Sequence, residues 1–127
     1  MKLDQLQHNY CIKMTRHVKR YYFSVYPIIN RNEIDYYEIK VGNSFKSNCI
    51  TLTEILKEKD EVTGIRFSYN NEDDEPAEKD ATLTEPARIK IITGSPRNYL
   101  IQDIAFEIIP KDENTIIGAD TIIHDLG

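Results

Sequence analysis

The feature that most constrains the fold is a stretch toward the C-terminal end in which apolar and polar residues alternate. Every second side chain is large and mostly apolar, and the intervening positions carry acidic or small side chains. The first set is Leu100, Gln102, Ile104, Phe106 and Ile108, and the second is Asp103, Ala105 and Glu107. Because successive side chains of a β-strand point to opposite faces of its sheet, the alternation predicts a strand with one buried face.

Shorter alternating stretches recur along the chain, and we expect about six or seven strands in all. Ile65, Phe67 and Tyr69 alternate with polar residues, as do Ile89 and Ile91. Isoleucine is the commonest residue, and its branched side chain packs well on a pleated surface. Short connections favour antiparallel neighbours. The predicted fold is mainly β, a small antiparallel sandwich or curved sheet with one or two short helices, and an α+β arrangement is the alternative.

The N-terminal segment fits two periodicities. Apolar residues at helical spacing predict a helix or arm over residues 1–16, whereas a strand would place Tyr10, Ile12 and Met14 on one face. We favour the helix. The apolar stripe consists of Leu3, Leu6, Tyr10, Met14 and Val18.

A second helix is expected to begin near residue 51. Thr51 is a suitable N-cap, Glu54 stands three residues later to complete a capping box, and Ile50 and Ile55 could form a hydrophobic staple. The helix would end near Asp60, and residues 62–64 would turn the chain into the next strand.

The segment from residue 21 to residue 41 predicts a tyrosine-rich β-hairpin that turns at residues 30–33. Pro27 lacks an amide hydrogen, so it indicates a sheet edge or an interruption. A hairpin in a small domain cannot bury both faces, and exposed tyrosines are typical of protein contact surfaces. The alternative is that the rings line the rim of the core. The candidate partner-binding residues are Tyr21, Tyr22, Tyr26, Tyr36 and Tyr37.

Charge is distributed unevenly along the chain. The net charge is −5, yet the first fifty residues carry +4 and the remainder carries −9. A basic cluster close to tyrosines could contact nucleic acid or an acidic protein surface. The acidic balance of the whole chain favours the protein surface, since nucleic-acid binders are usually strongly basic. The cluster comprises Lys13, Arg16, Lys19 and Arg20.

Residues 70–80 form an acidic segment that we expect to be a flexible surface loop. Its central carboxylates are Glu72, Asp73, Asp74 and Glu75, and Pro76 follows them. Calcium takes about six to eight oxygen ligands, and the helix–loop–helix calcium motif also needs a glycine, which the segment lacks. We therefore expect no metal site here. Mimicry of a phosphate backbone is the alternative function for the segment.

The sequence contains no motif of a recognisable enzyme. It has no histidine or cysteine spacing typical of zinc sites, no glycine-rich phosphate loop and no nucleophile signature. No catalytic residue, cofactor or metal is therefore predicted. Catalytic groups can assemble from distant positions, so an enzyme of unrecognised type remains a third hypothesis.

Cellular location is predicted from what the sequence lacks. A signal peptide or a membrane span of about twenty apolar residues is not evident. We therefore expect a cytoplasmic protein with reduced thiols that makes no membrane contact. Whether Cys11 and Cys49 pair stays open.

The expected function follows from these features together. A chain of 127 residues suits one domain spanning 1–127. The prediction is a non-catalytic protein-interaction module, either a small subunit of a larger assembly or an inhibitor-type docking protein, that binds a protein partner or a second copy. A nucleic-acid-associated protein is the alternative.

Overall fold

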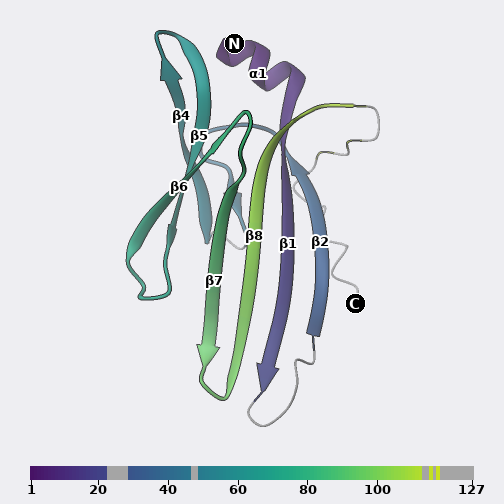
Figure 1. Cartoon of the computed structure of the whole chain (residues 1–127), viewed down its shortest axis with the longest axis vertical. Coiled ribbons are helices and arrows are strands. Elements are labelled where there is room, and N and C mark those ends of the chain that lie inside the picture. The colour runs from purple at the N-terminus through teal and green to yellow at the C-terminus, as the bar shows by residue number, and fades with distance from the viewer. Residues whose placement is uncertain (23–28, 47–48, 113–114, 116, 118–127) are drawn as a thin grey trace.

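Two four-stranded antiparallel sheets and one short helix make up the structure (Figure 1). It is a computed structural model, and it describes residues 1–22, 29–46, 49–112, 115 and 117. The expectation of a mainly β, antiparallel sandwich with a short helix is confirmed. The strands number eight within the described residues, more than the expected six or seven.

The first sheet, sheet A, has the strand order β2-β1-β8-β7. Its long central strands pair over their full length, with Arg16 opposite Ile104. The strands are β1 (Tyr10–Tyr22), β2 (Ile29–Tyr37), β7 (Ala87–Ser95) and β8 (Asn98–Pro110).

The second sheet, sheet B, has the order β3-β4-β5-β6. Gly64 lies where β5 approaches β6 so closely that a Cβ atom would stand 2.3 Å from the Ala81 carbonyl oxygen. The strands are β3 (Ser44–Phe45), β4 (Ile50–Glu58), β5 (Glu61–Asn70) and β6 (Pro76–Thr82).

The core lies between the two sheets. The alternating residues of β8 face inward as predicted, and Ile104, Phe106 and Ile108 are buried. The ring of Phe106 stacks on Phe67 of sheet B with the centroids 4.3 Å apart, so aromatic contacts join the two layers. At one end the sandwich is closed by the helix α1 (Leu3–Asn9), whose Leu6 is fully buried (Figure 1).

The expected helix over residues 1–16 is wrong beyond Asn9, because β1 begins at Tyr10. In β1 the side chains of Ile12, Met14 and Val18 are buried on one face, as the strand interpretation required. A spacing of four residues is common to both periodicities, since it is close to one helical turn and also an even number of strand positions. The N-terminal stripe therefore could not distinguish them.

The expected helix at residues 51–60 is also wrong, because this segment forms β4. Ile50 and Leu52 are buried opposite Tyr69 and Phe67 of β5. The β-branched residues in the segment suit a strand, and cross-strand burial outweighs a local capping box whose worth is about 1 kcal/mol. The chain turns at residues 59–60, so residues 62–64, predicted to form this turn, lie within β5.

A hairpin is formed by β1 and β2, but it differs from the predicted one, because only Tyr21 and Tyr22 of the predicted first strand lie in β1. Residues 30–33 lie inside β2, where Asn32 pairs with His17 and Glu33 with Arg16. Of these polar residues, Asn30 and Asn32 are exposed on the outer face of the strand, whereas Arg31 and Glu33 lie on the inner face and are paired there with each other. Tyr26 and Pro27 lie outside the described residues.

The acidic segment is partly strand, whereas a loop was predicted over residues 70–80. Residues 71–75 form a turn, and Pro76 opens strand β6. The Asn71 side-chain oxygen accepts hydrogen bonds from the amides of Asp73 and Glu75. Polar residues form a strand here because β6 lies at a sheet edge, with only Ala81 buried.

Candidate interaction surfaces

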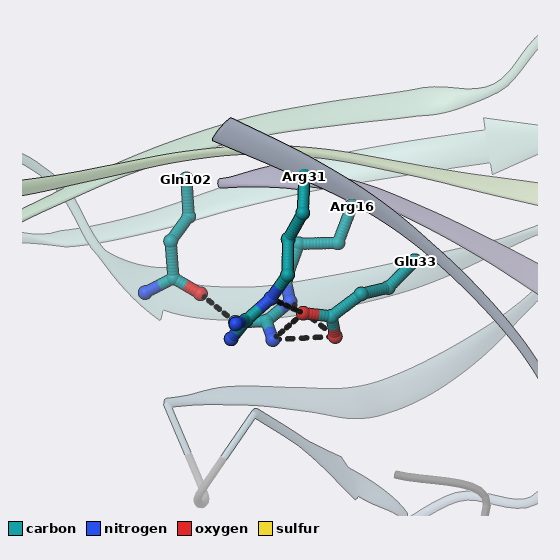
Figure 2. Close-up of polar contacts among 4 residues, drawn as sticks. All are labelled: Arg16, Arg31, Glu33 and Gln102. Carbon is teal, nitrogen blue, oxygen red and sulfur yellow. Dashed lines mark hydrogen bonds and ion pairs between the residues drawn. The ribbon is translucent and has the colours of Figure 1, made fainter. Parts of the chain in front are cut away.

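The inner face of sheet A carries a buried polar cluster, shown in Figure 2. Arg16 is 5% exposed and donates to both carboxylate oxygens of Glu33, which is 2% exposed. The same guanidinium donates to the Gln102 side-chain oxygen at 2.6 Å, and Arg31 also donates to Glu33. The cluster links β1 to its two neighbours in sheet A, β2 and β8.

Neither Glu33 nor Gln102 was predicted to matter, although the sequence contained a signal. Arg16 interrupts the apolar series Ile12, Met14 and Val18, and Gln102 interrupts the apolar face of β8. A charged side chain on a buried face requires a partner of opposite charge. Arg16 therefore requires a buried carboxylate, but its spacing does not identify Glu33, which lies in the segment predicted to be a turn.

The structure divides the predicted basic cluster between two faces of β1. Arg16 lies inside the polar cluster, and Arg20, on the same face, donates to the Asn98 side chain at 3.0 Å. Lys13 and Lys19 occupy the alternate positions and therefore lie on the outer face. The four cations thus do not form one surface.

The outer face of sheet A carries both positive and negative charges. Arg88 and Lys90 of β7 lie on this face, so two strands contribute its cations. Between these strands lies β8, where Asp103 stands beside His17 and Lys90, and Glu107 beside Lys13. Acidic residues therefore separate the basic ones. Such a balanced face suits a protein surface better than a phosphate backbone.

The predicted tyrosines occupy different environments. Tyr21 stacks on Tyr99 with the ring centroids 5.1 Å apart, and Tyr22 is 38% exposed. Tyr36 is half-buried, whereas Tyr37 packs edge-on against the core residue Phe45. Burial and the neighbouring Asp35 raise the pKa of Tyr37 to about 12, against the opposing effect of Arg16. Tyr37 therefore packs against the core, and Tyr26 lies outside the described residues.

Strand β2 is the outermost strand of sheet A and presents an edge. Ile34, at its centre, is 44% exposed on the outer face of the sheet. On its outer side, within the described part of the chain, Tyr36 forms an isolated parallel bridge with Ile117. The edge of β2 thus already accepts backbone pairing from another segment.

A cleft of about 850 Å³ lies between the tip of the β5–β6 hairpin and β7, at the opposite edge of sheet A. One wall is formed by the end of β5, the acidic turn and the start of β6, and the other by residues 91–93 of β7. Cys49 also lines it and is exposed. The acidic segment singled out in the sequence thus borders a concave surface.

The two thiols do not pair, since both cysteines are free. Burial and the nearby Asp112 raise the pKa of the buried Cys11, while Lys111 lowers it, with burial the largest effect. Among the described residues, no group of three histidine, cysteine, aspartate or glutamate side chains lies close enough together to hold a metal ion.

No described helix is long and apolar enough to cross a bilayer.

The fold is a small antiparallel β-sandwich in which, among the described residues, β2 and β7 are the outermost strands of sheet A. Comparisons of the chain with protein-family models, with curated proteins and with solved structures returned no match.

Proposed function

We propose that the protein is a non-catalytic protein-interaction module that binds an extended segment of a partner along the edge of β2. It would act as a small subunit of an assembly or as an inhibitor-type docking protein. The observation that carries the proposal is the parallel bridge between Tyr36 and Ile117. A strand edge that pairs with one segment has the geometry to pair with another, and strand addition is a common mode of peptide recognition.

The surroundings of β2 define the chemistry of the partner segment. On the outer face, the exposed Ile34 lies in register with Thr15, and Thr15 with Ala105. An added strand would lie on the other side of β2 from Thr15, where the exposed Ile34 offers an apolar contact to an aliphatic side chain. On the inner face the edge carries Arg31, whose side chain is 29% exposed. The fitting segment is therefore extended, with aliphatic residues on one side and polar residues on the other.

The buried polar cluster supports this function by fixing the edge. Arg16 and Glu33 join β1 to β2 at the middle of their register, so β2 is held in place before a partner binds. An edge that is already ordered loses less conformational entropy on binding than a segment that must first fold.

The test compares the proteins captured by the wild type and by two single variants. Ile34→Lys introduces a charge at the edge, a substitution that opposes strand addition. Leu83→Lys is the matched control, because Leu83 is 39% exposed and lies between β6 and β7. Circular dichroism checks that both variants fold. We expect a specific partner to be retained by the wild type and by Leu83→Lys but lost by Ile34→Lys. Equal capture by all three proteins would contradict the proposal.

The nucleic-acid alternative has its own test. Fluorescence titration with single-stranded and duplex oligonucleotides at low salt would reveal binding through Lys13 and Lys19 together with Arg88 and Lys90. The acidic residues of β8 among these cations lead us to expect no binding that falls steeply with salt. Steep salt dependence, lost in Lys13→Gln/Lys19→Gln, would favour the alternative.

A further inference from the structure

We propose that the cleft between the β5–β6 hairpin and β7 is a second binding site, for an extended protein segment in which lysine or arginine alternates with apolar residues. This site lies at the β7 edge of sheet A, whereas the proposed partner edge is β2 at the other side of the same sheet. The two sites are therefore independent surfaces.

The shape of the cleft fits an extended chain. It runs between a hairpin tip and a strand, and Figure 1 shows the β5–β6 tip lying beside β7. Its volume of about 850 Å³ lies within the range of binding pockets, which is about 300–1,000 Å³. The cleft is a groove between two walls, which suits a segment laid along it.

The negative charge of the cleft favours a ligand that carries positive charge. Glu72, Asp74 and Glu78 line it, and no lysine or arginine is among its described lining residues. Within the described part of the chain, none of these three carboxylates forms an ion pair. The lining of the cleft is therefore acidic and complements lysine or arginine side chains, with the nearest cations, Lys79, Arg88 and Lys90, in an adjacent hollow that shares Glu72, and with Arg66 under the electrostatic influence of Glu78.

The acidic wall is held in a defined position. The Asn70 amide donates to the Asp74 carboxylate at 3.2 Å, and the amide of Asp74 donates to the carbonyl of Asn71. Pairing of β5 with β6 continues to Asn70 and Pro76, at the base of the turn. An ordered wall reduces the entropy lost when a ligand binds.

The opposite wall supplies apolar contacts and a strand edge. Ile91 and Ile92 of β7 line the cleft, and Ile92 is 38% exposed. Strand β7 is the last strand of sheet A, so its outer side faces the cleft without a paired strand in the described structure. Ile91 and Ile92 point to opposite faces of sheet A, so a segment pairing there would place alternate side chains beside the exposed Ile92 and on the inner face, toward sheet B and its acidic hairpin tip. The proposed segment therefore has apolar residues on the side of Ile92 and lysine or arginine on the side of the hairpin tip.

The experiment uses a fluorescein-labelled peptide of alternating lysine and valine, titrated with the full-length protein and followed by fluorescence anisotropy. The cleft variant is Glu72→Gln/Asp74→Asn/Glu78→Gln. The matched control, Glu38→Gln/Glu58→Gln/Asp60→Asn, removes the same charge from exposed residues outside the cleft. We expect the cleft variant to bind about tenfold more weakly than the wild type, from the sum of three exposed ion pairs, and the control to change far less.

Amide hydrogen exchange and two competitors complete the test. We expect the lysine–valine peptide to slow exchange at residues 91–93, and spermine and a glutamate–valine peptide to compete poorly. No binding of the lysine–valine peptide, equal weakening in both triple variants, or equal competition by the glutamate–valine peptide would overturn the proposal. Strong competition by spermine without protection of residues 91–93 would overturn the assignment to an extended segment.

Discussion

Arg16 of β1 and Glu33 of β2 are opposite one another in the strand register, and the guanidinium of Arg16 donates to both oxygens of the Glu33 carboxylate. Both side chains are almost wholly buried. A buried ion pair gains stability only when its remaining hydrogen-bonding groups also find partners, and Gln102 and Arg31 supply such partners here. The pair therefore fixes which residues of β2 face inward, and with them the position of the proposed binding edge.

Removing one partner of this pair should destabilise the protein strongly. For Glu33→Leu we expect the free energy of unfolding to fall by about 3 kcal/mol, because the Arg16 guanidinium loses the carboxylate that balances its charge in a buried site. Urea unfolding monitored by circular dichroism measures the loss. The double variant Arg16→Met/Glu33→Leu should recover most of it, since an apolar pair replaces the buried charges. A double variant no more stable than Glu33→Leu would show that the pair is not the source of the effect.

The strands predicted best from sequence were those with strict alternation. In β8 the residues Ile104, Phe106 and Ile108 face the core as their spacing indicated, and the inward Ile89 and Ile91 of β7 agree as well. An alternating pattern fits a strand and does not fit a helix, so these segments had one interpretation. The mainly β class followed from them.

The segments predicted wrongly were those in which local signals fit more than one structure. Thr51 and Glu54 have capping-box spacing, but the burial of Leu52 opposite Phe67 is a long-range contact that no local window contains. Residues 30–33 resemble a turn because they are polar, and their place in β2 depends on pairing with β1. In both segments, contacts between strands distant in the sequence outweighed the local signal and produced a β-strand.

The candidate surfaces were only partly predictable for the same reason. The sequence singled out the acidic segment, but its position beside β7 depends on how the two sheets pack. It grouped Arg16 with Lys13 and Lys19, which the two faces of β1 separate. Ile34, central to the proposed edge, was not singled out, because its exposure follows from the place of β2 at the end of sheet A.

Tyr37 should make stability depend on alkaline pH. Its pKa is raised from 10.0 to about 12 in the folded protein, chiefly by burial. Between these values the unfolded tyrosine ionises while the folded one keeps its proton, so its contribution to stability is full below pH 10 and is lost as pH rises toward 12. Urea unfolding across this window measures the loss. Tyr37→Phe should lose less stability over the same window, and an identical loss in both proteins would contradict the assignment.

The two cysteines should differ sharply in reactivity. Cys49 is exposed, whereas Cys11 is buried and its pKa is raised mainly by that burial. Because the thiolate is the reactive form, iodoacetamide should modify Cys49 in the native protein and Cys11 only after unfolding. Mass spectrometry of digested samples locates the modification, and Cys49→Ser serves as the control. Native modification of Cys11 at a rate similar to that of Cys49 would contradict the burial.

The central claim is that the edge of β2 receives an extended segment of a partner. Its most direct test is amide hydrogen exchange of the protein alone and in the purified complex with the partner it captures. The account predicts slower exchange within Ile29–Tyr37 in the complex, and no complex with Ile34→Lys. Unchanged exchange in β2 while protection falls on the outer face of sheet B would contradict it, as would a chain that captures no partner.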